Sequence, residues 1–181
     1  MRKNKERSFK AAFGGIIAAL SIVLMFLTGV IPTLTYAIPA ICGALLMTIV
    51  IEINSGFAGL VYVAVSILSL LVVADKEAAV MYTAFFGYYP IVKSFIEKKT
   101  NNIASWIIKY LIFNISMIAS YFVVSKVFMI TFDDIDSFGK FAMPLLLLLG
   151  NIVFAVYDIA LTRLVTAYLM SWRKYIKRVF K

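Results

Sequence analysis

The sequence predicts an all-α integral membrane protein with six transmembrane helices in one bundle and both termini in the cytoplasm. Three observations carry this prediction. The 181 residues are 63% hydrophobic with a mean hydropathy of +0.96, whereas soluble domains are roughly 45–50% apolar. The apolar residues form long continuous runs, which is typical of membrane helices. Basic residues gather in three segments outside these runs, as they do on the cytoplasmic side of membrane proteins.

The number of apolar runs sets the number of helices, because a helix needs about 20 apolar residues to cross the hydrocarbon layer. We treat the whole chain, residues 1–181, as one membrane domain. The predicted helices cover about residues 9–30, 34–53, 56–73, 78–96, 104–128 and 141–170.

The first helix follows the basic start MRKNKERSFK and contains the run AAFGGIIAALSIVL. A secretion signal is the alternative for this segment, with an apolar region of about 7–15 residues before a cleavage site of small residues. The run here is longer and passes into Pro32 and Pro39 without such a site. We therefore interpret it as a membrane helix.

The remaining helices differ in how continuous they are. The short stretch EINSG predicts a tight turn between the second and third helices. The fourth contains Gly87, Pro90 and Lys93, so it is predicted to be short, kinked or tilted. The end of the sixth helix is expected to leave the membrane.

The distribution of charge predicts the orientation. An even number of helices places three basic segments on one face, which is the cytoplasmic face by the positive-inside rule. These segments are the N-terminus, the Lys93–Lys99 loop and the C-terminus. The opposite face has TGVIPTLTY, ADKE and TFDDIDSFGK, which are neutral to acidic. The net charge of +9 therefore orients the chain and implies no nucleic-acid partner.

The composition and the motifs argue against disulfide, metal and catalytic sites. There is no His, and the single Cys42 lies in an apolar run, which excludes a disulfide framework and a Cys/His metal cluster. The acidic stretch TFDDID has too few partners for a metal site. Neither a nucleophile elbow nor a phosphate-binding glycine loop is present. We expect no enzyme activity, no metal and no cofactor.

Polar residues inside the predicted helices are candidates for function, because they are costly in a bilayer. Asp158 and Lys109 lie at similar depths in the sixth and fifth helices, so we expect them to form an ion pair. Asn114 and Asn151 lie deeper, and two interpretations remain open for them. They either form hydrogen bonds between helices or line a ligand cavity.

A stripe of small residues marks the first helix. Ala11, Gly15 and Ala19 are spaced i, i+4, i+8 and therefore share one helix face. Small residues let two helix backbones approach closely in a membrane. The partner helix is either one of this chain or one of another subunit.

Several polar and aromatic residues are expected near the outer face. They include Tyr36 in the first outer loop, Glu77 in the second, Tyr82 in the fourth helix and Lys126 at the end of the fifth. Aromatic residues at this depth often anchor a protein at the membrane surface. An outward-opening ligand pocket would use the same residue types.

The layout resembles the substrate-binding S components of energy-coupling factor (ECF) transporters. The similar features are six helices in about 180 residues, cytoplasmic termini and the small-residue stripe of the first helix. The amino-acid sequence itself is similar over roughly residues 11–71, including YAIPAICGALLMTIVIEINSGFAGLVYVAVSILSLL. In the rest of the chain, only the layout of the helices is similar.

This resemblance implies a function in the bacterial cell membrane. An S component captures a vitamin-like or other trace nutrient from outside and docks on a transmembrane T component, and two cytoplasmic ATPases drive uptake. The docking residues would be Ala11, Gly15 and Ala19. The substrate-binding residues would be Tyr36, Glu77, Tyr82, Asn114, Lys126 and Asn151. No vitamin-specific pattern is present.

Two other functions remain open. The size and layout are similar to those of the small MreD-type cell-shape proteins, which are membrane scaffolds without transport activity. Such a scaffold would have its interior filled by side chains. A small self-assembling channel or transporter would need a polar path across the whole bilayer.

Overall fold

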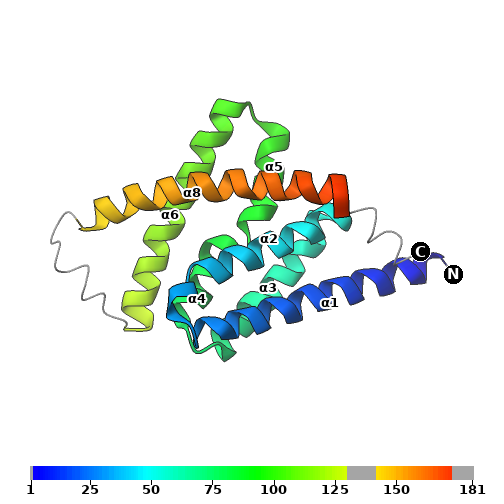
Figure 1. Cartoon of the computed structure of the whole chain (residues 1–181), viewed down its shortest axis with the longest axis horizontal. Helices are drawn as coiled ribbons and strands as arrows, with labels where there is room; N and C mark the ends of the chain where they lie inside the picture. Colours follow the sequence, from blue (N-terminus) through cyan, green and yellow to red (C-terminus); the bar gives the residue numbers. More distant parts are fainter. Residues whose placement is uncertain (1, 130–141, 173–181) are drawn as a thin grey trace.

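The computed structural model describes residues 2–129 and 142–172, which form six helical segments (Figure 1). A 3-10 turn, η1, lies between the first two. Four segments are single helices: α1 Arg2–Thr28, α2 Ala37–Glu52, α3 Ser55–Val72 and α6 Asn102–Val127, with η1 at Pro32–Leu34. The fourth segment consists of α4 Lys76–Met81, the π-helix η2 Tyr82–Phe86 and α5 Tyr89–Lys99. The last consists of α8 Ala142–Ala167 and the π-helix η4 Tyr168–Trp172. The all-helical prediction is confirmed.

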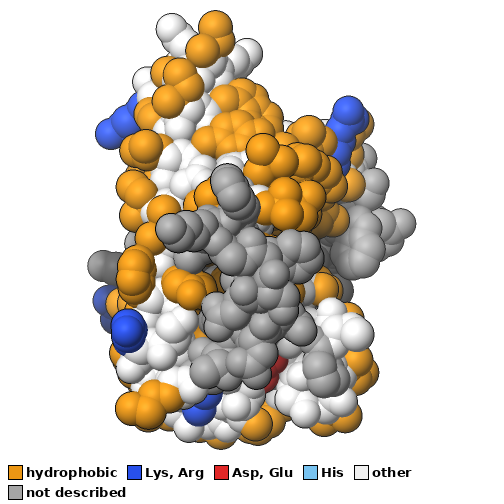
Figure 2. Space-filling view, turned by 90° about the vertical axis from the view of Figure 1, so that its left-hand side faces the viewer, with side chains coloured by type: hydrophobic (Ala, Val, Ile, Leu, Met, Phe, Trp, Pro, Cys, Tyr) orange, Lys and Arg blue, Asp and Glu red, His pale blue; other side chains and the backbone are white. Residues whose placement is uncertain are grey.

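Four of these helices are long and apolar enough to cross a membrane, counted over the described residues. They are α1, α3, α6 and α8. The helix α2 is apolar but has 16 residues. At most a third of the residues in each long span are buried inside the chain. Figure 2 shows the consequence on one face, where hydrophobic side chains dominate the described surface. Such a surface indicates a multi-pass membrane protein.

The helices α1, α2 and α3 pack tightly against one another and form the larger part of the core. The turn between α2 and α3 is short, as predicted. Asn54 caps α3 there, because its side-chain oxygen accepts a hydrogen bond from the backbone N–H of Phe57 at 2.7 Å. Gly14 of α1 allows the close approach to α3, since a Cβ at Gly14 would lie 2.6 Å from the Phe57 ring.

The fourth helical segment is broken, as its glycine and proline predict. Asp75 caps the start of α4, because its carboxylate accepts a hydrogen bond from the backbone N–H of Ala78 at 3.0 Å. It passes into η2, and α5 begins after Gly87 with Pro90 in its first turn. Gly87 packs against two aromatic rings, since a Cβ there would lie 2.6 Å from the Tyr62 ring. Proline and π-helical turns are common causes of such breaks.

The fourth segment runs from Lys76 to Lys99, where the sequence predicts about residues 78–96. One prediction about this region needs correction. Lys93 does not belong to a basic loop, since its side chain is 1% exposed within α5. The apolar span Arg7–Thr28 agrees with the first predicted span of about residues 9–30, and the polar N-terminal residues extend the same helix back to Arg2.

The ends of the helices alternate between two sides of the molecule. The N-terminal end of α1, the α5–α6 turn and the C-terminal end of α8 lie toward the top and right of Figure 1. We call this side the basic end, since it carries Arg7, Lys10, Lys98 and Lys99. The connections that follow α1 and α3 lie toward the lower left, and we call this side the acidic end.

Two sequence features fall outside the described residues. The acidic stretch TFDDIDSFGK covers residues 131–140, and the basic C-terminal residues follow Trp172.

Candidate functional site

An apolar cavity of about 420 Å³ lies between the α4–η2 segment, α6 and α8. Aromatic rings and aliphatic side chains form most of its walls, and the Glu77 carboxylate and the Tyr36 hydroxyl lie at the acidic end. The lining residues used below are Tyr36, Glu77, Phe85, Phe113, Met117, Ser120, Gly150, Phe154 and Tyr157. Tyr36 is 55% exposed, so the cavity reaches the surface at the acidic end.

Hydrogen bonds join the two connections at the acidic end. The Tyr36 hydroxyl donates a hydrogen bond to the Glu77 carboxylate. The Thr35 hydroxyl donates to the Asp75 carboxylate at 2.8 Å. Partial burial and the hydrogen bond to Glu77 raise the pKa of the Tyr36 hydroxyl above its ordinary value, so this group remains protonated. Two of the predicted substrate residues, Tyr36 and Glu77, therefore lie together at this cavity.

The other predicted residues of the outer face do not line this cavity. Tyr82 is fully buried and belongs to the core formed by α1, α2 and α3. Its hydroxyl has no hydrogen-bond partner among the described residues. Lys126 is exposed in the last turn of α6. The structure thus brings neither residue to the cavity wall.

Asn114 and Asn151 join α6 to α8 by two hydrogen bonds. Each amide nitrogen donates to the side-chain oxygen of the other residue, at 2.9 Å and 3.1 Å. Each also donates to a backbone carbonyl of its own helix, that of Tyr110 for Asn114 and that of Leu147 for Asn151. This arrangement corresponds to the first of the two interpretations, a helix-to-helix contact.

Asp158 lies at the centre of a buried ionic cluster near the basic end. Its carboxylate accepts from Lys93 Nζ at 2.5 Å, from Lys109 Nζ at 3.0 Å and from the Tyr89 hydroxyl at 2.5 Å. The predicted pair between Asp158 and Lys109 is confirmed. The side chains of Lys93, Lys109 and Asp158 are each at least 96% buried.

Glu97 completes this cluster and balances its charge. Its carboxylate oxygen Oε1 lies 2.8 Å from Lys93 Nζ and 2.6 Å from Lys109 Nζ. The side chain is 41% exposed, so the cluster connects the interior with the surface.

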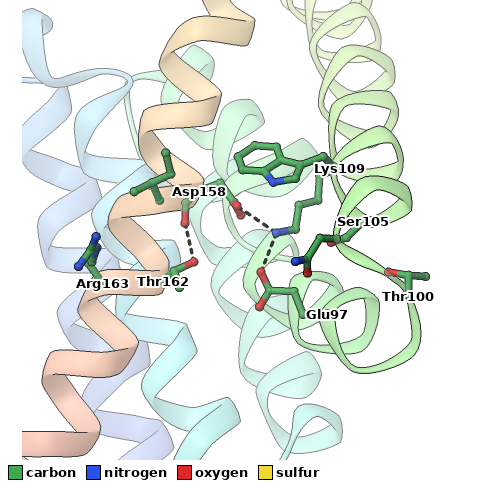
Figure 3. Close-up of a pocket in the computed structure, with 10 residues that line it drawn as sticks. Glu97, Thr100, Ser105, Lys109, Asp158, Thr162 and Arg163 are labelled. Atoms are coloured by element: carbon green, nitrogen blue, oxygen red, sulfur yellow. Dashed lines mark hydrogen bonds and ion pairs between the residues drawn. The ribbon is translucent and has the colours of Figure 1, made fainter.

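A polar cavity of about 440 Å³ lies beside this cluster (Figure 3). Glu97, Lys109 and Asp158 form part of its wall, together with Thr100, Asn102, Ser105, Trp106, Ile159, Thr162 and Arg163. Figure 3 shows the Lys109 ammonium group between the two carboxylates. The Lys109 nitrogen also lies 5.3 Å from the centre of the Trp106 ring, a cation–π contact. The cavity is therefore walled by polar groups close to the α5–α6 turn.

The sequence prediction did not include Lys93, Glu97 or Tyr89 in a site. The signal was present in their spacing, because Tyr89, Lys93 and Glu97 follow one another at intervals of four residues. Residues at this interval share a helix face. Counting Lys93 with the basic residues of the following loop hid this face.

The small-residue stripe of α1 faces away from the chain. Ala11, Gly15 and Ala19 are exposed. A Cβ at Gly15 would meet none of the described residues within 4 Å. The neighbouring Gly14 is instead buried against α3. Among the described residues, no other helix of this chain therefore packs against the stripe.

Comparisons with protein-family models, with curated proteins and with solved structures find no match for this chain. Within residues 2–129 and 142–172, no three His, Cys, Asp or Glu side chains form a group that could hold a metal ion. The functional argument thus depends on the two cavities, the ionic cluster and the exposed stripe.

Proposed function

We propose that this chain is the substrate-capture subunit of an ECF-type importer. It binds a vitamin-like or other trace nutrient from outside and docks on a transmembrane T component, and two cytoplasmic ATPases drive the uptake. This proposal rests on the resemblance of the first three helices and on two features of the structure, the apolar cavity and the exposed stripe.

The proposal places all six helical segments across the bacterial cell membrane. The fourth span consists of α4, η2 and α5, which together cover residues 76–99. The basic end then faces the cytoplasm and the acidic end faces outside, in accordance with the positive-inside rule. In this orientation the apolar cavity opens outward, where a nutrient arrives.

The apolar cavity is the observation that carries the proposal. Its volume of about 420 Å³ falls in the range of small-molecule sites, which combine apolar walls with a few polar groups. Aromatic rings of Phe85, Phe113 and Phe154 suit a flat or apolar ligand body. Glu77 and Tyr36 suit a polar or cationic group at one end of the ligand. A scaffold of the MreD type would instead have this space filled by side chains.

The exposed stripe supports the docking half of the proposal. Ala11, Gly15 and Ala19 leave a shallow surface on the basic-end half of α1. A helix of the T component would approach the α1 backbone closely there, because small side chains permit such contact in a membrane.

Mass analysis of the purified protein tests the capture function. We expect native mass spectrometry in detergent to find a small molecule bound at one per chain. The substitution Ser120→Phe places a ring in the apolar cavity and removes this molecule. The matched substitution Ala119→Phe, on the exposed side of the same helix, retains it. Release of membrane lipid alone from the unmodified protein would contradict the proposal.

Co-purification with a T component tests the docking role. Gly15→Leu adds bulk to the exposed stripe, where no described side chain stands in the way. We expect it to fold and to lose the T component, whereas Ile16→Leu at an exposed neighbouring position retains it. An unchanged yield of T component with Gly15→Leu would contradict the docking role.

A further inference from the structure

The wall of the apolar cavity carries charge at one side chain. Among the described residues that line this cavity, Glu77 is the single acid, and neither Lys nor Arg is present. The Glu77 side chain is half-buried, and its one hydrogen-bond partner among the described residues is the Tyr36 hydroxyl. A partly buried carboxylate without a counter-charge is unfavourable. The described wall therefore lacks one positive charge.

The neighbouring Lys76 does not supply this charge. Its ammonium group donates hydrogen bonds to the backbone carbonyls of Leu70 and Val73, both at 2.9 Å. These carbonyls lie at the C-terminal end of α3, where a helix leaves carbonyl groups unpaired and a lysine can bind them. Lys76 is thus held at the end of α3 and does not line the cavity, although it precedes Glu77 in the sequence.

Lys126, the other described lysine of the acidic end, lies on the opposite side of its helix. Val124 lines the cavity, and Lys126 follows two residues later, about 200° further around α6. Lys126 is also exposed. These two lysines therefore leave the Glu77 carboxylate available to a positive charge on a ligand.

The inner part of the cavity is aromatic. The rings of Phe113 and Phe154 are stacked with their centres 4.8 Å apart, and the Phe85 ring packs edge-on against both. Phe113 and Phe154 lie eight residues from Tyr121 and Leu146, which line the cavity nearer the acidic end. The two levels are therefore about 12 Å apart along the helix axes. Aromatic rings accept flat apolar bodies and attract cations to their faces.

We propose that the captured nutrient is an organic cation with a flat apolar body. Its positive group binds Glu77 at the acidic end, and its body packs against the rings of Phe85, Phe113 and Phe154. This inference rests on the proposed capture function, because it names the chemical class of the molecule that the same cavity binds. A ligand with a carboxylate or phosphate group at this end would meet the Glu77 carboxylate and is therefore rejected.

Tyr36 positions the Glu77 carboxylate for such a ligand. Its hydroxyl donates to Glu77 Oε1, and no described residue donates to Oε2. An ammonium N–H of the ligand can bind Oε2, and a second one can bind the Tyr36 oxygen, since a hydroxyl accepts while it donates. Tyr36 is 55% exposed, so the positive group keeps part of its hydration while the apolar body is buried.

Three probes with one ring body and different charge test the inference. They are naphthylmethylamine, which is protonated at neutral pH, naphthylmethanol, which is neutral, and naphthoate, which is an anion. Each is titrated by calorimetry into the full chain after dialysis in nonionic detergent. Titration into empty micelles gives the heat of partition, which is subtracted.

We expect the ammonium probe to bind at one per chain, with a Kd at least about tenfold lower than that of the alcohol, and naphthoate not to bind. Glu77→Gln keeps the side-chain shape and an acceptor for the Tyr36 hydroxyl. It should raise the Kd of the ammonium probe about tenfold and leave that of the alcohol unchanged, which also shows that the variant is folded.

The matched control is Asp75→Asn. It removes the neighbouring carboxylate, which does not line the cavity, and retains a residue that caps α4. This variant should keep the preference for the ammonium probe. An equal loss in Asp75→Asn and Glu77→Gln would overturn the inference, because the preference would then come from the general charge of the acidic end.

The inference is also overturned when the alcohol or naphthoate binds as tightly as the ammonium probe, or when none of the three binds. If Glu77→Gln does not fold, the three probes with the unmodified chain decide. The mass analysis of the co-purified molecule separates this inference from the capture function. A bound molecule without a positive group supports capture and overturns the cationic class, whereas the absence of any bound small molecule contradicts capture itself.

Discussion

Replacement of Asp158 by asparagine is the most informative test of how the interior of this chain is held together. Asp158 on α8 contacts Lys93 on α5 and Lys109 on α6, so it links three helices. Asp158→Asn keeps the shape of the side chain and removes its charge. The set of Lys93, Lys109, Glu97 and position 158 then changes from neutral to a net charge of +1.

The expected loss of stability depends on how deeply the two lysines are buried and on the carboxylate that still contacts them. Removing one partner of a buried ion pair costs about 3–5 kcal/mol, because it leaves an uncompensated charge in a poorly polar environment. The two lysine side chains are 1% and 4% exposed, which places them in this class. Glu97 stays beside both of them and is 41% exposed. We therefore expect a loss near the lower limit, about 3 kcal/mol.

The double substitution Asp158→Asn with Lys109→Met serves as the matched comparison. It leaves Lys93 with Glu97, so the cluster is neutral again. Free energies of unfolding are measured by circular dichroism in mixed micelles with increasing fractions of denaturing detergent. We expect the double variant to be more stable than Asp158→Asn alone by about 1–2 kcal/mol. A double variant less stable than the single one would refute the charge-balance reasoning.

Two other predictions concern contacts between helices. Gly14→Ala should lower the melting temperature in detergent because the methyl group meets the Phe57 ring, whereas Gly15→Ala should not lower it; equal melting temperatures would contradict this difference. Asn114→Leu and Asn151→Leu should show a coupling free energy of about 0.6–1.7 kcal/mol in a double-mutant cycle of unfolding. Strictly additive effects would show that the amide pair does not join α6 to α8.

The helical layout could be predicted from the sequence because apolar runs and their interruptions are local properties. The EINSG turn is encoded by Asn54, whose side chain caps the following helix. The break in the fourth segment is encoded by Gly87, which directly follows η2, and by Pro90 in the first turn of α5. The polar extension of α1 back to Arg2 was not predicted, since hydropathy marks where a helix becomes apolar and not where the helix itself begins.

The apolar cavity could be predicted only in part. Tyr36 lies in the connection before α2 and Glu77 in the first turn of α4, so the order of the helices brings both to the same end, near the cavity. Tyr82 occurs six residues after the start of α4, and its direction depends on the rotation of the π-helical segment. Rotation about a helix axis is determined by packing, and the sequence pattern alone did not give it.

The ionic cluster shows why residue type and spacing have to be weighed together in membrane helices. The sequence prediction placed Lys93 in the fourth helix and also counted it with Lys98 and Lys99 among the basic residues that follow this helix. Its spacing from Tyr89 and Ile96 indicates a buried position instead, since all three lie on the buried face of α5. A buried lysine in an apolar segment requires a carboxylate from another helix, and Asp158 of α8 is the residue that meets this requirement. The same requirement draws α5, α6 and α8 together below the apolar cavity, so the residues that close its inner side follow from charge pairing between helices.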